Sequence, residues 1–357
     1  MSSASLAPSK ITKTTLSTLL SLYPHTIREV YKSKLLSKAA SKTGKKPPAG
    51  KKPTAAAPAK DSEKAIKKDL DEFLQLDKLR YETIPTAVLG RIEAGVGLNA
   101  EDDGGDGERP RKRAKTGSKK SPSASKASGP FLEKEEIVQL MDWKLKHGSH
   151  RPALLGMIRS NPEPLVRSTT SLAFSQLQTA LSSSTNDDDD DDDGDDAFPA
   201  TPLETLTGPL RGVGPATASL FLSIAPSSSS YSNRTPNSAA GNDMDINAAP
   251  FFSDELFYWL CAGRYPELEK GEGKAKAVPP VKIKYNMKEY RQLWEAVREL
   301  RGRVNGGVSV GDEEGEGEGE GEEGRSFSVL DVERVAFVIG HIDVSGYVDG
   351  GEGEVSA

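Results

Sequence analysis

Residues 210–224, LRGVGPATASLFLSI, combine a glycine-rich turn with the start of an apolar helix. Gly212 and Gly214 permit backbone angles and close approaches that a Cβ would prevent, and Pro215 suits the first turn of a helix. The N–H groups of such a turn and the positive end of the helix point outward together, which makes a site for an anion such as a nucleic-acid phosphate. The candidate phosphate-binding residues are Arg211, Gly212, Val213, Gly214, Ala216 and Thr217.

The same stretch resembles the helix-hairpin-helix motif, whose core is a leucine, any residue, Gly-Val-Gly and then small residues at helical spacing. The matching residues are Leu210, Gly212, Val213, Gly214, Thr217 and Ala218. More specifically, the chain resembles the helix-hairpin-helix DNA glycosylase superfamily, in which the hairpin leads through a loop into an apolar-Asp segment. PFFSDELFYWL at 250–260 stands in that place, and Asp254 is the matching carboxylate.

The resemblance covers roughly residues 131–345 and implies an all-α, DNA-binding domain that works in DNA repair. It implies that Asp254 is the catalytic anion, which stabilises an oxocarbenium-like sugar while the damaged base is flipped out of the duplex. Members that add a lyase step carry a lysine two residues after the second glycine, where this chain has Ala216. For an enzyme, the resemblance therefore implies a monofunctional DNA N-glycosylase without a cofactor and without a Schiff-base step.

Both motifs also have a purely structural interpretation. Gly-Val-Gly-Pro can be a tight turn between packed helices. Ser253, Asp254 and Glu255 can be the N-cap and first turn of a helix, a role compatible with catalysis by Asp254. The chain departs from the family at Glu255, where a small polar residue is usual, and this second carboxylate adds repulsion to a site for a polyanion.

Charge is divided unequally along the 357 residues. The chain has a net charge of −6, but residues 1–130 hold 26 of the 47 basic residues and only 14 of the 53 acidic ones. RPRKRAK at 109–115 is typical of an exposed nuclear-import signal, so we expect a nuclear protein and an import receptor as a partner. Its basic residues are Arg109, Arg111, Lys112, Arg113 and Lys115. The acid-poor N-terminus leaves a mitochondrial address as the alternative.

Low-complexity tracts divide the chain. We expect a mostly disordered basic arm over 1–128, one helical domain over 129–345, and a disordered tail over 346–357. Pro24 limits residues 11–40 to two short helices, and 62–80 predicts an amphipathic helix that docks either on a partner or on this chain's own domain. Helical periodicity recurs at 132–148, 152–161, 162–181, 251–263, 286–304 and 328–342, between acidic or polar inserts at about 183–200, 226–249 and 305–325.

Other chemistries find little support in the sequence. The single cysteine, Cys261, excludes an intramolecular disulfide and a thiolate metal cluster. His147 and His150 lack a third ligand nearby, so we expect no metal site. Trp143, Trp259 and Trp294 lie on amphipathic segments and are expected in the core. No apolar run approaches the ~20 residues that a membrane helix needs.

A second class of function remains open. A non-enzymatic scaffold in a chromatin-associated complex would use the acidic tracts, including DDDDDDDGDD at 187–196, to engage basic proteins such as histones. In that case the glycines of the turn would serve folding alone. The DNA-binding hypothesis instead predicts that Gly214→Asp weakens DNA binding and leaves the fold intact.

Overall fold

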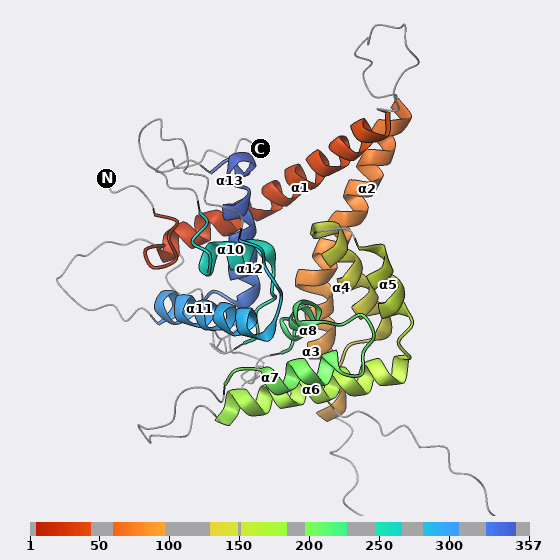
Figure 1. Ribbon diagram of the computed structural model, residues 1–357, viewed down its shortest axis with the longest axis vertical. Coiled ribbons are helices and arrows are strands. Elements are labelled where there is room, and N and C mark those ends of the chain that lie inside the picture. The colour runs from red at the N-terminus through yellow and green to blue at the C-terminus, as the bar shows by residue number, and fades with distance from the viewer. Residues whose placement is uncertain are drawn as a thin grey trace, which may run out of the picture.

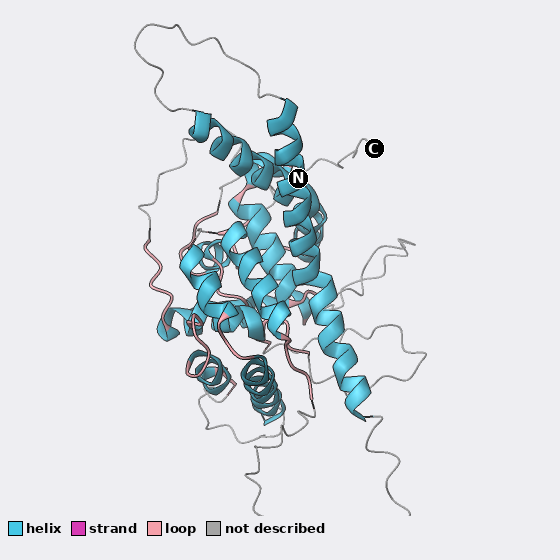
Figure 2. Cartoon of the chain, turned by 90° about the vertical axis from the view of Figure 1, so that its right-hand side faces the viewer, coloured by secondary structure: helices cyan, strands magenta, loops and turns pink. Residues whose placement is uncertain are grey.

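The computed structural model describes residues 5–43, 60–96, 129–148, 151–183, 197–226, 248–265, 281–306 and 326–347. These residues form helices joined by loops and contain no strand, so the predicted all-α class is confirmed (Figure 2). The helices are α1 (Lys13–Thr43), α2 (Lys60–Lys78), the π-helix η1 (Leu79–Thr83), α3 (Ile84–Val96), α4 (Lys134–His147), α5 (Pro152–Arg159), α6 (Glu163–Ser183), α7 (Ala200–Thr207), α8 (Pro215–Leu222), α10 (Asp254–Leu260), α11 (Met287–Asn305), α12 (Val329–Gly340) and α13 (Ile342–Ser345).

The other helices surround α8 (Figure 1). In this view α10, α11 and α12 lie to its left, α4 and α5 to its right, and α6 and α7 below it. Helix α8 contacts α4, α6, α7 and α11, which explains why its sequence is apolar around most of its circumference. The turn that precedes α8 lies against α5, because a Cβ on Gly212 would be 2.9 Å from the Met157 Cβ.

Helix α1 corrects the expected N-terminal arm. It runs without a break through Pro24 and packs along α12, whereas the sequence predicted two short helices in a mostly disordered segment. Leu16, Leu19, Tyr23 and Ile27 are buried in the same core as the later helices. A proline inside a helix costs about 3 kcal/mol, and the burial of this apolar stripe offsets that cost.

Helix α2 docks on its own domain, one of the two alternatives left open by the sequence. Its Leu70 and Phe73 are buried, and the Phe73 ring stacks on Tyr31 of α1 with 3.8 Å between ring centroids. Contacts with α1 and α4 cover its apolar face. The boundary expected at residue 128 therefore does not separate an arm from the core, because residues from both sides of it share one hydrophobic cluster.

A buried polar network holds these early helices to the rest. Arg80 of η1 forms an ion pair with Glu333 of α12 at 3.0 Å, and the Tyr81 hydroxyl donates to the same carboxylate at 2.8 Å. Asp77 accepts hydrogen bonds from the Tyr23 hydroxyl and from the Trp143 indole N–H. All of these side chains are buried, and hydrogen bonds depend on direction as well as distance. The network therefore fixes how α1, α2, α4 and α12 are positioned against one another.

Candidate functional site

One cavity of about 280 Å³ is lined both by the glycine turn and by the segment that carries Asp254. Its walls come from the end of α4, the residues before and within α5, the start of α8, the start of α10 and the loop before α11. Gly212, Gly214, Ala216 and Thr217 contribute the turn side of the wall. Two stretches about 40 residues apart in the sequence therefore meet at one hollow.

The turn is held in place by a buried asparagine. Asn161, which follows α5, accepts a hydrogen bond from the Arg211 N–H at 2.9 Å and donates to the Arg211 carbonyl at 3.1 Å. Asn161 is fully buried, so this pair of bonds fixes the turn against the end of α5. The sequence did not single out Asn161, because a lone asparagine in a polar linker is typical of an ordinary turn.

The two glycines of the turn meet different demands. Gly212 has a φ of +79°, and a Cβ there would lie 2.9 Å from the Met157 Cβ of α5. Gly214 is extended, with φ −105°, and a Cβ there would meet nothing within 4 Å. Gly212 therefore needs a residue without a Cβ, whereas the exposed Gly214 has a backbone conformation that any residue can adopt, and its predicted role in the close approach of a ligand stays a prediction.

The other predicted turn residues divide by burial. Val213 and Thr217 are buried, whereas the Arg211 side chain is exposed and Ala216 is half-buried at the cavity wall. The Val213 side chain is therefore a core group, and the Val213 N–H donates a hydrogen bond to the Leu210 carbonyl within the turn at 3.4 Å. The Thr217 hydroxyl is already an acceptor for the Lys144 amine at 2.9 Å.

Asp254 occupies the first turn of α10 and lines the cavity. The N-cap of this helix is Ser253, whose hydroxyl accepts a hydrogen bond from the Leu256 N–H at 3.1 Å. Capping therefore does not require the Asp254 side chain, which instead accepts a hydrogen bond from the Tyr285 hydroxyl. Burial, followed by the hydrogen bond and charge of Asp254, raises the pKa of Tyr285, so this phenol stays protonated.

Lys144 of α4 brings an amine to the same cavity. Its Nζ lies 2.9 Å from the Thr217 hydroxyl and 5.5 Å from the centre of the Phe251 ring. Burial lowers the pKa of Lys144 to about 7, and this effect outweighs the nearby Asp254 carboxylate, which favours the charged form. The sequence offered only a lysine in the last turn of a helix, which is common there for reasons of the helix dipole.

Glu255 repels an anionic ligand less than its position beside Asp254 in the sequence suggested. Burial raises the pKa of Glu255 to about 7, and the neighbouring Asp254 charge adds to this shift. Near neutral pH much of Glu255 is therefore protonated, which reduces the repulsion that two adjacent carboxylates would exert on an anionic ligand. Its side chain contacts α12, where a Cβ on Gly340 would lie 3.3 Å from the Glu255 Cγ.

His147 is a core residue in this structure. Its ring lies 4.7 Å from the ring centres of both Trp143 and Phe337, and burial lowers the pKa of His147 to about 3. Within the ranges that the structure describes, no group of three or more His, Cys, Asp or Glu side chains could hold a metal ion. Trp143, Trp259 and Trp294 are all buried, as the sequence predicted.

Charge on the described part of residues 129–347 is nearly balanced. These residues include 16 basic and 14 acidic side chains, because 25 of the 39 acidic residues after position 130 lie in segments outside the described ranges. The acidity expected of this part of the chain is therefore concentrated in the tracts. Arg151, Arg159 and Arg211 are exposed around α5 and the turn, and Arg151 also lines the cavity.

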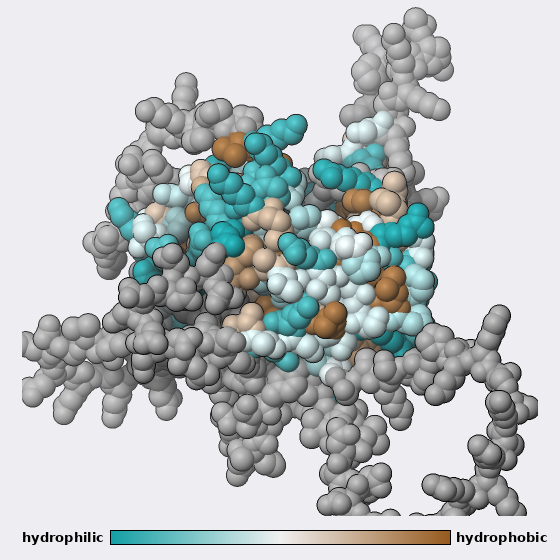
Figure 3. Space-filling view, turned by 60° about the horizontal axis from the view of Figure 1, so that its bottom comes forward, coloured by the Kyte–Doolittle hydropathy of each residue, from teal (hydrophilic) through white to brown (hydrophobic). Residues whose placement is uncertain are grey.

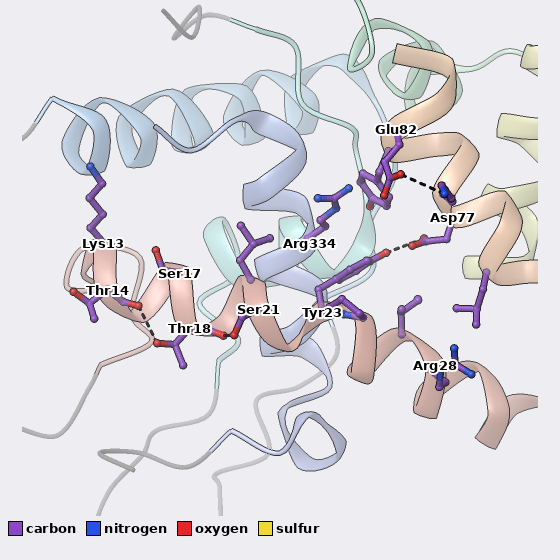
Figure 4. Close-up of a pocket in the computed structure, with 16 residues that line it drawn as sticks. Lys13, Thr14, Ser17, Thr18, Ser21, Tyr23, Arg28, Asp77, Glu82 and Arg334 are labelled. Carbon is purple, nitrogen blue, oxygen red and sulfur yellow. Dashed lines mark hydrogen bonds and ion pairs between the residues drawn. The ribbon is translucent and has the colours of Figure 1, made fainter. Parts of the chain in front are cut away.

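A second and larger hollow, about 980 Å³, opens between α1, α2 and α12 (Figure 4). Hydroxyl groups of α1 form one wall, and Arg334 lies opposite, with its guanidinium 4.1 Å from the centre of the Tyr81 ring. Asp77 and Glu82 also line it, but Tyr23 donates to Asp77 and Lys78 pairs with Glu82. It shares no lining residue with the cavity around Asp254.

Hydrophobic residues on the described part of the face in Figure 3 form separate small patches among hydrophilic ones. The large apolar side chains that are exposed belong to different elements: Leu36, Met157, Leu172, Val281 and Val344. Scattered exposed apolar residues of this kind are ordinary and do not indicate a protein-docking surface. Three features named in the sequence analysis lie outside the described residues. They are the import-like cluster at 109–115, His150 and the acidic tract at 187–196.

Comparison with known proteins identifies no relative. No family model matches the chain, and neither the curated proteins nor the solved structures contain a match. None of the helices in the described ranges is long and apolar enough to cross a membrane. The case for a function therefore rests on the cavity and on the resemblance carried by the turn and Asp254.

Proposed function

We propose that this chain is a nuclear DNA-binding protein of the helix-hairpin-helix glycosylase type, and that the cavity beside Asp254 receives a nucleotide extruded from the duplex. The observation that carries the proposal is that the glycine turn and Asp254 line one cavity. A turn that served packing alone would have no reason to share a hollow with a half-buried carboxylate. The volume of about 280 Å³ suits a single base or sugar rather than a larger ligand.

The phosphate contact is assigned to the backbone at the start of α8. Gly214 is exposed, and the space where its Cβ would lie is open, so a phosphate can approach the main chain there. The exposed Arg211, three residues before Gly214, and Arg151, which lines the same cavity as Gly214, supply positive charge to this approach. These contacts read no sequence, and they position the duplex so that one nucleotide faces the cavity.

Asp254 supplies the chemistry of base excision in this proposal. As the bond between the base and C1′ of the sugar breaks, the electron pair leaves with the base and positive charge develops on the sugar. The Asp254 carboxylate stabilises that charge, and a water molecule then adds at C1′ and releases a proton, which the departed base takes up. Tyr285 holds the Asp254 carboxylate in place for this role.

Duplex binding by the full chain tests the proposal. We expect salt-dependent binding to duplexes that contain an abasic-site analogue, with several-fold weaker binding by Gly214→Asp, because the new carboxylate repels the phosphate. Gly90→Asp is the matched control, since Gly90 is exposed on α3 and has the same open space at its Cβ position. The full chain is required because α1 belongs to the core.

Two results would overturn the proposal. One is the absence of binding at low salt by a chain that unfolds cooperatively, and the other is equal binding by wild type and Gly214→Asp.

Once DNA binding is confirmed, the variant Asp254→Asn tests whether Asp254 takes part in base excision. We expect the Asp254→Asn variant to bind DNA but to produce no abasic sites, which are detected by cleavage of the DNA strand. The reason is that the amide cannot stabilise the sugar cation as an anion does.

Nuclear import is assigned to the basic cluster at 109–115. Replacement of Lys112 and Arg113 by alanine in a fluorescent fusion is expected to move the protein from the nucleus to the cytoplasm. Substitution of Lys119 and Lys120, in the neighbouring tract, is the control and should leave the distribution unchanged. A nuclear signal that persists in the first variant, or a mitochondrial signal in the wild type, contradicts the assignment.

A further inference from the structure

The cavity beside Asp254 contains an amine that the sequence motifs do not assign. Lys144 comes from α4, about 70 residues before the turn, and its Nζ donates a hydrogen bond to the Thr217 hydroxyl at 2.9 Å. The side chain is half-buried and forms part of the cavity wall together with Asp254, Glu255 and Tyr285. The amine therefore faces both the enclosed space and the start of α8.

The surroundings of Lys144 favour a neutral amine. Burial is the main cause, Arg151 acts in the same direction and Asp254 opposes both, and together they lower the pKa of Lys144 to about 7. An ordinary lysine has a pKa of about 10.4, so less than a thousandth of it is neutral at pH 7. A large fraction of Lys144 carries a free electron pair at the same pH, which is the requirement for attack on a carbonyl group.

We propose that Lys144 is an imine-forming amine, and that it condenses with the aldehyde of an open-chain sugar held in the cavity between α4, α8 and α10. The ligand class follows from the wall: an apolar ring from Phe251 beside hydroxyl and carboxyl groups that suit a polyhydroxylated chain. The ring-opened sugar of an abasic site is the member of this class that the proposed DNA-binding function would deliver, and that choice rests on the proposed function. This amine belongs to α4 and not to the turn, where Ala216 occupies the position of the lysine that some members of the resembled family carry.

The reaction balances without a further reagent. The Nζ electron pair forms a bond to the aldehyde carbon, and the carbonyl oxygen takes up the proton that the nitrogen releases, which gives a carbinolamine. The carbon–oxygen bond then breaks, the nitrogen electron pair forms the C=N bond, and the oxygen leaves as water after it gains one more proton. Glu255 lines the cavity and is protonated to a large extent near neutral pH, because burial raises its pKa to about 7. It can therefore give that proton to the leaving oxygen and recover one from the nitrogen.

Reductive trapping with a small aldehyde tests Lys144 independently of DNA. The full chain is incubated with 2-deoxyribose 5-phosphate and cyanoborohydride, which delivers hydride to an imine and leaves a stable secondary amine. Peptide mapping by mass spectrometry is expected to find modification at Lys144 at least tenfold above that at other lysines at pH 7. The preference should shrink toward pH 10, where ordinary lysines also become neutral.

Two variants make the result specific. Lys144→Arg supplies a permanently charged group that can still donate a hydrogen bond to Thr217 but cannot form an imine, so the adduct at this position should disappear. Lys146→Arg is the matched control, because Lys146 lies on the same helix but does not line the cavity, and it pairs with Asp142 at 3.0 Å. Its adduct pattern at Lys144 should equal that of wild type. Thermal unfolding of both variants shows that neither result reflects misfolding.

The same trapping on a duplex with one abasic site separates this inference from the DNA function. A covalent complex that wild type and Lys146→Arg form and Lys144→Arg loses supports both proposals. If the small aldehyde is trapped at Lys144 and the duplex is not trapped at all, the proposal that Lys144 forms an imine stands. The proposal that its ligand is an abasic site in DNA is then contradicted. No preference for Lys144 over Lys146 with either probe overturns the inference, whatever the salt-dependent DNA binding shows.

Discussion

Tyr285 donates its phenolic hydrogen bond to Asp254, so a residue of the loop before α11 holds the carboxylate at the start of α10. Tyr285 has a φ of 55°, and it is the non-glycine residue with positive φ among the described residues. A left-handed conformation is costly for a large side chain and persists where the surroundings impose it. The Tyr285 N–H donates a hydrogen bond to the Glu289 carboxylate of α11 at 2.8 Å, so this backbone bond and the bond of the phenol to Asp254 together hold Tyr285 in place.

Tyr285→Phe should therefore affect chemistry more than binding. The variant removes the hydrogen bond and keeps the ring, so Asp254 loses its orientation while the turn, to which the proposed function assigns the phosphate contacts, is unchanged. We expect base excision to fall by about tenfold and the affinity for an abasic-site duplex to change by less than about twofold. Tyr258→Phe is the control, because the Tyr258 hydroxyl donates to the Val281 carbonyl instead. Equal loss of activity in both variants would contradict the role of Tyr285.

The two glycines of the turn should respond differently to alanine. Gly212→Ala forces a left-handed residue with a Cβ only 2.9 Å from the Met157 Cβ, and we expect a loss of roughly 2 kcal/mol or more in the free energy of unfolding. Gly214→Ala places a methyl group in open space with an extended backbone, and the change should stay within about 0.5 kcal/mol. Urea unfolding followed by circular dichroism measures both values. Similar losses in the two variants would contradict the turn geometry.

Glu255 should make stability depend on pH. Folding raises the pKa of Glu255 from 4.5 to about 7 because burial disfavours the carboxylate. The folded state then keeps a proton that the unfolded state has released between these values, so this contribution to stability is complete below pH 4.5 and is lost as the pH rises through 7. Relative to Glu255→Gln, the wild type should lose about 3 kcal/mol between pH 4.5 and 8.

Urea unfolding of wild type and Glu255→Gln at a series of pH values measures this difference. The control is Glu295→Gln on the exposed face of α11, which should parallel the wild type at every pH. A constant difference between wild type and Glu255→Gln across the range would show that Glu255 ionises alike in the folded and unfolded chain.

Deletion of residues 1–43 should destabilise the whole domain. Helix α1 covers α12, and Leu6 also accepts a hydrogen bond from the Trp259 indole through its carbonyl. Loss of this segment exposes apolar residues of α12 and leaves the buried Trp259 N–H without its acceptor. We expect a fall of more than about 10 °C in the unfolding temperature, or an insoluble product. A chain without residues 1–43 that unfolds at the same temperature as the full chain would contradict this packing.

Much of the fold follows from local signals in the sequence. Helices α4, α5, α6, α10, α11 and α12 lie close to the ranges predicted by apolar periodicity, because each buries one face and carries a proline, serine or acidic residue near its start. The turn before α8 and the burial of the three tryptophans are local or compositional properties too. The all-α class needed nothing more.

Tertiary structure decided the rest, because its causes act between distant segments. Pro24 and the basic composition predicted that residues 11–40 do not form one continuous helix. The burial of the apolar side chains of α1 against α12 outweighs both effects. The cavity joins Gly214, Asp254 and Lys144, and no pattern along the chain relates α4 to the turn or to α10. The neutral amine of Lys144 likewise depends on burial by neighbours far away in the sequence, which lowers its pKa only once the helices have packed around it.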